Sequence, residues 1–248
     1  MAGRAAEPEV IWARPERTGR GPRPAYTRAD IAAAAVRIAD AEGLDAVSMR
    51  RVAAELGCGT MSLYNYVPRK EDLYELMVDA VGAEHEIREP SGDWRADMLR
   101  NAEETRAIMR RHTWVPRLMT GVYGFSPNTL RYLEHCLACL EPLDVPHSTK
   151  MELIALVNGV VTTYTANEIA TAERTRSMPW SAEEENAVRM AYLGSQVAGG
   201  AYPRLAAAFG EASGPIDLEA VFRRALERVL DAFDPGLRRA GGDVPDGS

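Results

Sequence analysis

The chain has 248 residues, of which 46% are hydrophobic and 26% are charged, and it contains only three cysteines. This composition is typical of a soluble globular protein with room for two ordinary domains, and it excludes a disulfide-stabilised scaffold. No stretch approaches the ~18 consecutive apolar residues of a membrane span, and the first residues do not resemble a secretory signal. We therefore expect a cytoplasmic protein with no membrane partner.

The net charge of −7 is distributed unevenly along the chain. Residues 1–70 carry 11 Lys and Arg against 8 Asp and Glu, whereas residues 71–248 carry 18 against 28. A basic segment attracts phosphate and an acidic one repels it. Any contact with nucleic acid is therefore expected at the N-terminal end, with the acidic remainder directed away from it.

Residues 1–25 are rich in arginine and proline and have almost no apolar periodicity, which predicts a disordered tail. Alternatively, Arg20 and Arg23 belong to an arm that enters a DNA minor groove. The first helix is predicted to start after Thr27, because Thr27 and Asp30 form a capping-box pattern, and to end at Gly43.

Three further short helices are predicted before residue 84. Ser48 caps a helix over 49–56, residues 57–59 form a turn containing glycine, and another short helix covers 60–66. A fourth helix opens at Pro68 and Lys70. A short helix, a three-residue turn and a second short helix make a helix-turn-helix, whose second helix can enter a DNA major groove.

Only helices are predicted after the boundary at 84–92, where Pro90, Ser91 and Gly92 interrupt the pattern. Their expected ranges are 93–111, 114–119, 126–141, 149–172, 181–198 and 216–233. The β-branched run 160–165 lies inside a helical pattern, which outweighs its local strand propensity. The sequence therefore predicts an all-α chain with a disordered tail at 1–25, a helix-turn-helix domain with its linking helix at 26–83, a helical domain at 84–235 and a disordered tail at 236–248.

The run SMRRVAAELGCGTMSLYNYVPRKEDLYELMVDAV, preceded by AAAAVRIADAEGLDAVS, resembles the DNA-binding domain of the tetracycline-repressor (TetR) family. Gly57, the Leu63-Tyr64-Asn65-Tyr66 segment and Lys70 carry the resemblance. The remainder is similar in helix number and length to the family's ligand-binding domain. The resemblance implies a fourth helix that joins a three-helix DNA-binding domain to a C-terminal bundle for ligand binding and dimerisation.

The resemblance also implies roles for individual residues. Thr60, Met61, Ser62 and Tyr64 lie where the family contacts bases or nearby phosphates, and Arg50 where a side chain of the preceding helix reaches the groove. Tyr66 and Lys70 lie where the family contacts phosphate. The full candidate set is Ser48, Arg50, Thr60, Met61, Ser62, Tyr64, Asn65, Tyr66 and Lys70. The alternative is that Tyr64 and Tyr66 are partly buried packing residues and Lys70 a solvated charge.

A ligand-responsive transcriptional repressor is the function that the resemblance implies: a homodimer binds a palindromic operator and a small-molecule inducer releases it. The alternatives are a ligand-independent or activating DNA-binding protein and an all-α enzyme with an appended DNA-binding motif. The four histidines show no catalytic or metal-ligand spacing, and no phosphate-binding glycine loop or nucleophile elbow is present, so we do not expect an enzyme.

Dimerisation is expected through the apolar helices at about 149–172 and 216–233, where Asn158-Gly159 permits close backbone approach. The alternative is that both apolar stripes face the core of their own protomer. Aromatic side chains with polar tips suit a small apolar ligand, although such residues are often core packing instead. The candidate ligand-binding residues are Trp114, Tyr123, Phe125, Tyr132, Tyr164 and Asn167.

A magnesium site is the remaining implication of the resemblance, because tetracycline repressors proper hold drug-bound magnesium through a histidine. No histidine occurs at the corresponding place, residues 119–122, and Glu168 alone does not make such a site, which argues against tetracycline as the ligand. His135, Cys136 and Cys139 share a helix face, but two thiols supply only half of a structural zinc site. We expect these cysteines and Cys58 to be small hydrophobic residues, with no metal and no cofactor.

Overall fold

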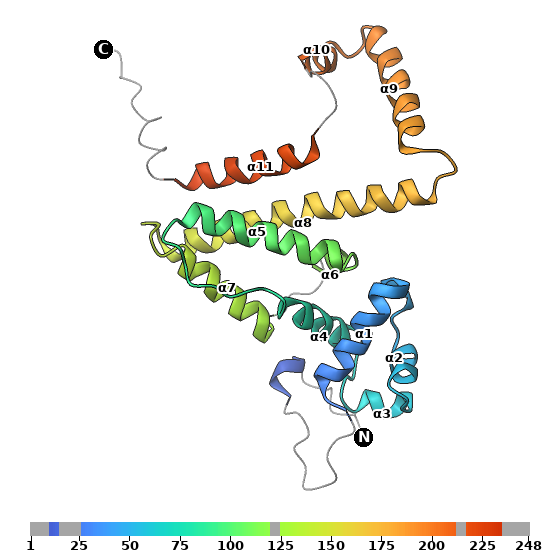
Figure 1. Cartoon of the computed structure of the whole chain (residues 1–248), viewed down its shortest axis with the longest axis vertical. Helices are drawn as coiled ribbons and strands as arrows, with labels where there is room; N and C mark the ends of the chain where they lie inside the picture. The colour runs from blue at the N-terminus through green and yellow to red at the C-terminus, as the bar shows by residue number, and fades with distance from the viewer. Residues whose placement is uncertain (1–9, 15–25, 120–124, 212–216, 235–248) are drawn as a thin grey trace, which may run out of the picture.

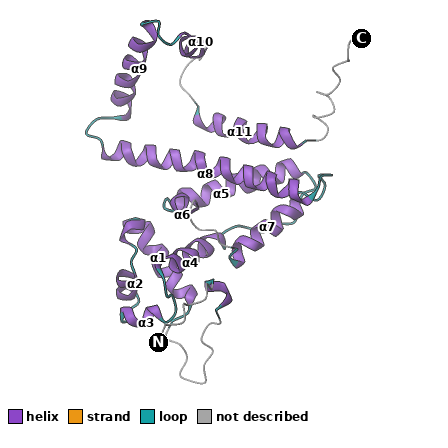
Figure 2. Ribbon diagram, turned by 180° about the vertical axis from the view of Figure 1, so that it is seen from behind, coloured by secondary structure: helices purple, strands orange, loops and turns teal. Residues whose placement is uncertain are grey.

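The computed structural model describes residues 10–14, 26–119, 125–211 and 217–234, and these residues form helices and turns with no strand. A small domain of α1–α4 lies at one end, and α5–α8 with α11 form a larger helical domain beside it (Figure 1). Helices α9 and α10 project away from the rest beyond the end of α8, as both views show (Figure 2). The predicted all-α class is confirmed. Within the described ranges, no helix is long and apolar enough to span a bilayer.

Helix α1 spans Arg28–Glu42 and begins as the capping-box pattern predicts. Thr27 Oγ1 accepts a hydrogen bond from Asp30 N at 3.1 Å, and Thr27 N donates to Asp30 Oδ2 at 2.8 Å. Gly43 ends the helix at φ +86°, a left-handed backbone conformation that glycine adopts without a Cβ clash. A short turn, η2, follows at Leu44–Ala46.

Helices α2 (Met49–Glu55) and α3 (Thr60–Tyr64) form the predicted helix-turn-helix. Ser48 Oγ accepts a hydrogen bond from Arg51 N at 3.1 Å and caps α2, and Gly57 in the turn has φ +68°. Leu63 and Val67 are buried and anchor α3 to the domain core, as predicted. Helix α3 ends two residues before the predicted Tyr66, within the usual uncertainty of helix boundaries.

Helix α4 (Lys70–Gly82) packs against α1 and leads into the second domain. Its inner side consists of Leu73, Leu76, Met77 and Val81, all buried. At its end, the side chain of Asp79 accepts hydrogen bonds from Asn128 N and Asn128 Nδ2, both at 2.8 Å. Helix α4 is therefore fixed to the DNA-binding domain at one end and to α7 of the second domain at the other.

The second domain is built from helices that begin where the sequence predicts. Asp93, Ser126 and Asp217 cap the first turns of α5, α7 and α11. The bounds are Trp94–Arg111 for α5, Val115–Met119 for α6, Pro127–Cys139 for α7, His147–Ser177 for α8, Ala182–Ala198 for α9 and Leu218–Phe233 for α11. Helix α8 is longer than predicted at its C-terminal end, and α10 (Pro203–Glu211) was not predicted at all.

A short turn, η1 (Ile11–Ala13), lies within the segment 1–25 that was expected to be disordered. Ile11 is only 1% exposed, and Trp12 Nε1 donates to Glu75 Oε2 of α4 at 3.1 Å. Arg28 Nη1 donates to the backbone oxygens of Ile11 and Arg14, both at 2.9 Å. For residues 10–14 the prediction is therefore wrong, because a buried apolar side chain and three hydrogen bonds fix them to the domain. The remaining residues of the two predicted tails lie outside the described ranges.

Candidate DNA-binding surface and ligand cavity

Helix α3 exposes the polar and apolar side chains that the sequence assigned to base contact. Met61 is 78% exposed, Tyr64 is 42% exposed, and Ser62 and Asn65 are also on the surface. Thr60, at the first turn, is half-buried. A methionine this exposed packs little against the described residues, and its side chain can contact a thymine methyl group.

Two adjacent arginines of α2 have different surroundings. Arg51 is held by carboxylates, at 2.7 Å from Glu42 and 3.0 Å from Glu55. Arg50 is exposed, and among the described residues no hydrogen bond or ion pair engages its side chain. A guanidinium that is not committed to a carboxylate can bind guanine bidentately, so Arg50 has the properties required of a base-reading residue.

Exposure differs between Lys70 and Tyr66, which the resemblance places at phosphate, and Ser48 is a further DNA-binding candidate. Lys70 is exposed at the first turn of α4, with its ammonium 5.2 Å from the centre of the Tyr74 ring. Tyr66 is half-buried and packs against the domain core. Ser48 Oγ already accepts the α2 capping bond, which leaves its hydroxyl proton to donate to a phosphate. These positions are compatible with backbone contacts on one side of α3 and base contacts on the other.

The residues predicted to bind ligand are not brought together in one place. Tyr132 lines a cavity, whereas Trp114 and Asn167 line an open hollow between η2, α6 and α8. Tyr164 packs edge-on against Phe222 at 5.9 Å, and Phe125 is 76% exposed. Tyr123 lies outside the described residues. Among the described members of this set only Tyr132 lines this cavity, and the set as a whole stays a prediction.

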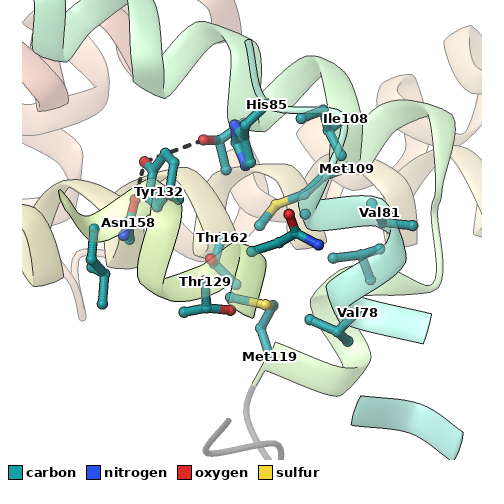
Figure 3. A pocket seen from close by; sticks show the side chains of 15 residues that line it. Val78, Val81, His85, Ile108, Met109, Met119, Thr129, Tyr132, Asn158 and Thr162 are labelled. Atoms are coloured by element: carbon teal, nitrogen blue, oxygen red, sulfur yellow. Dashed lines mark hydrogen bonds between the residues drawn. The ribbon is translucent and has the colours of Figure 1, made fainter. Parts of the chain in front are cut away.

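The cavity lies between α4, α5, α6, α7 and α8 and has a volume of about 120 Å³ (Figure 3). Most of its wall is apolar. The lining includes Val78 and Val81 of α4, Ile108 and Met109 of α5, Val115 and Met119 of α6, Thr129 and Tyr132 of α7, and Asn158 and Thr162 of α8. Because α4 supplies one side of the wall, an occupant of this cavity would touch the helix that carries the DNA-binding domain.

Tyr132, Asn158 and His85 bring polar groups close together in the cavity wall (Figure 3). Tyr132 Oη donates to Asn158 Oδ1 at 3.1 Å and lies 3.5 Å from Thr105 Oγ1. The ring of His85 lies against that of Tyr132, with 4.4 Å between centroids, and its buried Nδ1 has no hydrogen-bond partner among the described residues. Burial lowers the pKa of His85, which favours the neutral ring. This unsatisfied nitrogen belongs to a residue that lines the cavity, which makes His85 a candidate partner for a bound molecule.

Two sequence matches cover both domains. Residues 31–77 match the family described as bacterial regulatory proteins of the tetR family, and residues 88–235 match the tetracyclin repressor-like C-terminal domain. The chain belongs to the TetR family. The predicted family and the helix-turn-helix at the N-terminal end are thereby confirmed.

Relatives of this TetR-family chain match it over different shares of its length. The HTH-type transcriptional repressor DrrR1 of Streptomyces coeruleorubidus is 36% identical over 228 residues, covering 91% of this chain and 84% of the relative. The structure of ActR from Streptomyces coelicolor in complex with actinorhodin has 27% sequence identity and a TM-score of 0.71, covering 88% of this chain and 99% of that one. Tetracycline repressor protein class E of Escherichia coli is 28% identical over 114 residues, which is 45% of this chain and 54% of the relative.

Glu168, considered above as a magnesium ligand of the tetracycline-repressor type, is engaged by arginines in this TetR-family chain. Arg110 Nε donates to Glu168 Oε1 at 2.9 Å, and Arg106 Nη2 donates to Oε2 at 3.1 Å. In the part of the chain that the structure describes, no group of three or more His, Cys, Asp or Glu side chains could hold a metal ion. Glu168 has the contacts of a structural ion-pair residue between α5 and α8.

The two helical cysteines are buried beside Asn101, whose Nδ2 lies 3.8 Å from the sulfur of each. Burial raises the pKa of Cys136 to about 12 and also raises that of Cys139. Because the thiolate is the reactive and metal-binding form, both side chains are poor nucleophiles and poor ligands near neutral pH. Their surroundings agree with a packing role.

Acid should weaken the contact between α5 and α8. Burial alone would raise the pKa of Glu168, but hydrogen bonds from Arg110 and Arg106 outweigh it and hold this pKa below the usual 4.5. The folded pKa is lower than the unfolded one, so this contribution is fully present above about pH 4.5 and is lost as pH falls through the folded value. The pKa values of Glu84 and Asp97 are lowered in the same way.

We expect the midpoint of thermal unfolding to fall as pH is lowered below about 4.5, and to fall less steeply in Glu168→Gln, which has no proton to take up. The measurement is a calorimetric or fluorescence melt at several pH values and fixed ionic strength. The effect per group is modest because Glu168 is 36% exposed. Equal slopes in the two proteins would contradict this assignment.

His85 is the site residue that the sequence reasoning missed. It lies three residues after α4, in a linker whose Pro90 and Gly92 marked a domain boundary. A lone histidine in such a segment has no ligand spacing to distinguish it. The only available signal was its position directly after the helix that joins the two domains.

Proposed function

We propose that this chain is a ligand-responsive transcriptional repressor that binds a palindromic operator as a homodimer and is released by a small-molecule inducer. The observation that carries the proposal is the double role of α4: its first turn presents Lys70 beside the helix-turn-helix, and its last turns supply Val78 and Val81 to the cavity wall. The likeness to DrrR1, named a repressor, and to ActR, solved with actinorhodin, supports both parts of the proposal.

The cavity size supports a mechanism for release. Pockets for drug-sized ligands usually have volumes of about 300–1,000 Å³, whereas this cavity has about 120 Å³. A ligand larger than a single ring must therefore push its walls apart, and α4 is one of them. Movement of α4 would change the distance between the two recognition helices of a dimer, and a coupling of ~1–3 kcal/mol would weaken operator binding about 5- to 150-fold.

The dimer interface of this proposal lies on α8 and on the arm, which we define as α9 and α10. The apolar stripe of α11 is already used within the protomer, because Phe222, Leu226 and Leu230 are buried. Helix α8 has an exposed face of apolar and small side chains opposite its buried one: Met151, Ala155, Leu156, Gly159 and Thr163. The arm exposes further large apolar side chains: Val188, Met190, Tyr192, Leu205 and Phe209.

A second copy of the chain is the occupant that these exposed faces require, because the arm makes few contacts with the rest of its protomer and such exposed helices are only marginally stable in water. A dimer would also place two helix-turn-helix domains on half-sites one DNA turn (~34–36 Å) apart. The proposal retains the predicted contribution of residues 149–172 to the dimer interface. The apolar stripe of residues 216–233 packs instead into the core of its own protomer.

The test begins with duplexes selected from a random pool by the purified full-length protein. We expect an inverted repeat, bound by a dimer at fixed salt. A panel of apolar ring compounds, with actinorhodin among them, is then added, and release of the duplex identifies an inducer. Binding without release by any compound would favour a ligand-independent regulator. Turnover of a compound would favour an enzyme and contradict the proposal. In the proposal the protein acts only by binding, and it does so in the cytoplasm, where its operator is located.

Replacing His85 by leucine should reduce the response to an inducer that carries a hydrogen-bonding group. A ligand that satisfies the buried Nδ1 gains about 1–3 kcal/mol relative to one that leaves it unsatisfied. We expect the inducer concentration for half-release to rise about 10-fold or more, while operator affinity without inducer is unchanged. Met119→Ala is the control, because it alters the apolar wall outside α4 without touching this group. An unchanged half-release concentration in His85→Leu would rule out the contact.

A further inference from the structure

We propose that Asp40 of α1 is a positioning residue through which the ligand-binding domain holds the helix-turn-helix in the orientation that fits the operator. The inference rests on the proposed DNA-binding function. Asp40 Oδ1 accepts two hydrogen bonds from the corner between α5 and α6, one from Trp114 Nε1 at 2.7 Å and one with His112 Nδ1 at 2.9 Å. This contact joins the two domains independently of α4.

His112 extends the contact to the end of α4. Its Nε2 lies 2.8 Å from Glu84 Oε1, and Arg111 Nη2 donates to the other oxygen of Glu84 at 2.5 Å. Both ring nitrogens of His112 thus lie within hydrogen-bond distance of carboxylates. The ring therefore lies between the last turn of α1 and Glu84, two residues after α4, and it fixes the distance between them.

Burial of its donors distinguishes this cluster from the nearby ion pair of Arg117 and Asp45, which also joins the domains. His112 and Trp114 are 9% and 2% exposed, so breaking their bonds would leave buried donors without partners. Arg117 and Asp45 are bonded at 2.9 Å nearby, but their side chains are 58% and 85% exposed. An exposed ion pair contributes little to holding an orientation, whereas buried donors on a shared carboxylate oxygen restrict it strongly.

The cluster is also adjacent to the ligand cavity. Ile108 lies one helical turn before His112, and Val115 directly follows Trp114; both line the cavity. A ligand that widens the cavity at the corner between α5 and α6 would move the two donors of Asp40. Cavity occupancy would therefore reach the DNA-binding domain by two routes, through α4 and through Asp40.

The experiment uses the full-length protein, the duplex that it selects, and a second duplex whose half-sites are one base pair further apart. The variants are Trp114→Phe, which removes only the N–H donor, Asp40→Asn, and the double variant. We expect each single variant to bind the selected duplex about 5- to 10-fold more weakly and to discriminate less between the two spacings. A DNA-binding domain that is held less rigidly can adapt to half-sites at a different spacing. The double variant should resemble Asp40→Asn alone, since both changes break one shared contact.

Glu103→Gln, which removes the exposed pair with Arg223 within the ligand-binding domain, is the matched control and should leave both affinities unchanged. A purely structural role predicts lower unfolding midpoints with an unaltered ratio of affinities for the two spacings, and that result would overturn the inference. Additive losses in the double variant would also overturn it. Failure of the wild-type protein to select any duplex would overturn the proposed function and this inference together.

Discussion

Arg50→Ala should bind the selected operator about 10- to 100-fold more weakly while its affinity for unrelated duplexes changes little, because a bidentate contact to guanine contributes about 1–3 kcal/mol to discrimination. Arg50 is free of carboxylate partners within the described residues, unlike its neighbour. Arg51→Ala is therefore the matched control: it removes the same charge from the same helix, and we expect it to preserve sequence selectivity.

Lys70→Ala provides the complementary measurement. An ammonium that contacts phosphate contributes to all sequences alike, so this variant should weaken selected and unrelated duplexes by similar factors and lower the salt slope of binding by about 1. Affinities should be measured by fluorescence anisotropy at several salt concentrations. If Arg50→Ala instead weakens all duplexes equally, Arg50 is a phosphate contact and the assignment to base reading is wrong.

Phe222→Ala should have the largest effect on stability. Phe222 of α11 is 1% exposed and packs against Tyr164. The guanidinium of Arg106 lies 4.1 Å from the centre of the Phe222 ring. Loss of a buried phenyl group costs about 3–5 kcal/mol because it removes apolar burial and leaves a cavity. The midpoint of thermal unfolding should fall by roughly 10 °C.

Phe125→Ala is the control for this prediction, because the same atoms are removed from a side chain that is 76% exposed. Its effect on stability should lie within about 0.5 kcal/mol. Calorimetry and denaturant unfolding give the comparison. A similar loss in the two variants would mean that the phenyl group of Phe222 does not contribute through burial in α11.

Local sequence signals were sufficient for most of the fold. Capping residues such as Thr27, Ser48 and Asp93 act within one helical turn, so their pattern alone located the helix starts. The missed helix α10 follows Gly199-Gly200, and its side chains at 203–210 include none that is buried in the protomer, so no core-facing stripe marks it. The docking of Ile11 and Trp12 was also missed, although two large apolar residues in a polar segment were a usable signal.

The ligand cavity could not be predicted because its wall is assembled from residues far apart in the sequence. Periodicity identifies which face of a helix is apolar, but it does not say whether that face meets another helix or an empty space. Trp114 and Tyr164 were chosen for their residue type, and their partners proved to be Asp40 and Phe222, 74 and 58 positions away. Only the tertiary arrangement separates these packing residues from Tyr132 and His85.

The presence of Val78 and Val81 in the cavity wall has a consequence for how such a regulator can change over time. Any substitution at these positions that admits a new ligand also alters the helix that sets the position of the DNA-binding domain. One such substitution therefore changes both ligand choice and operator affinity. Substitutions on the α8 side of the cavity, at Asn158 or Thr162, leave α4 unchanged. They can therefore change which inducer binds without also altering the position of the DNA-binding domain.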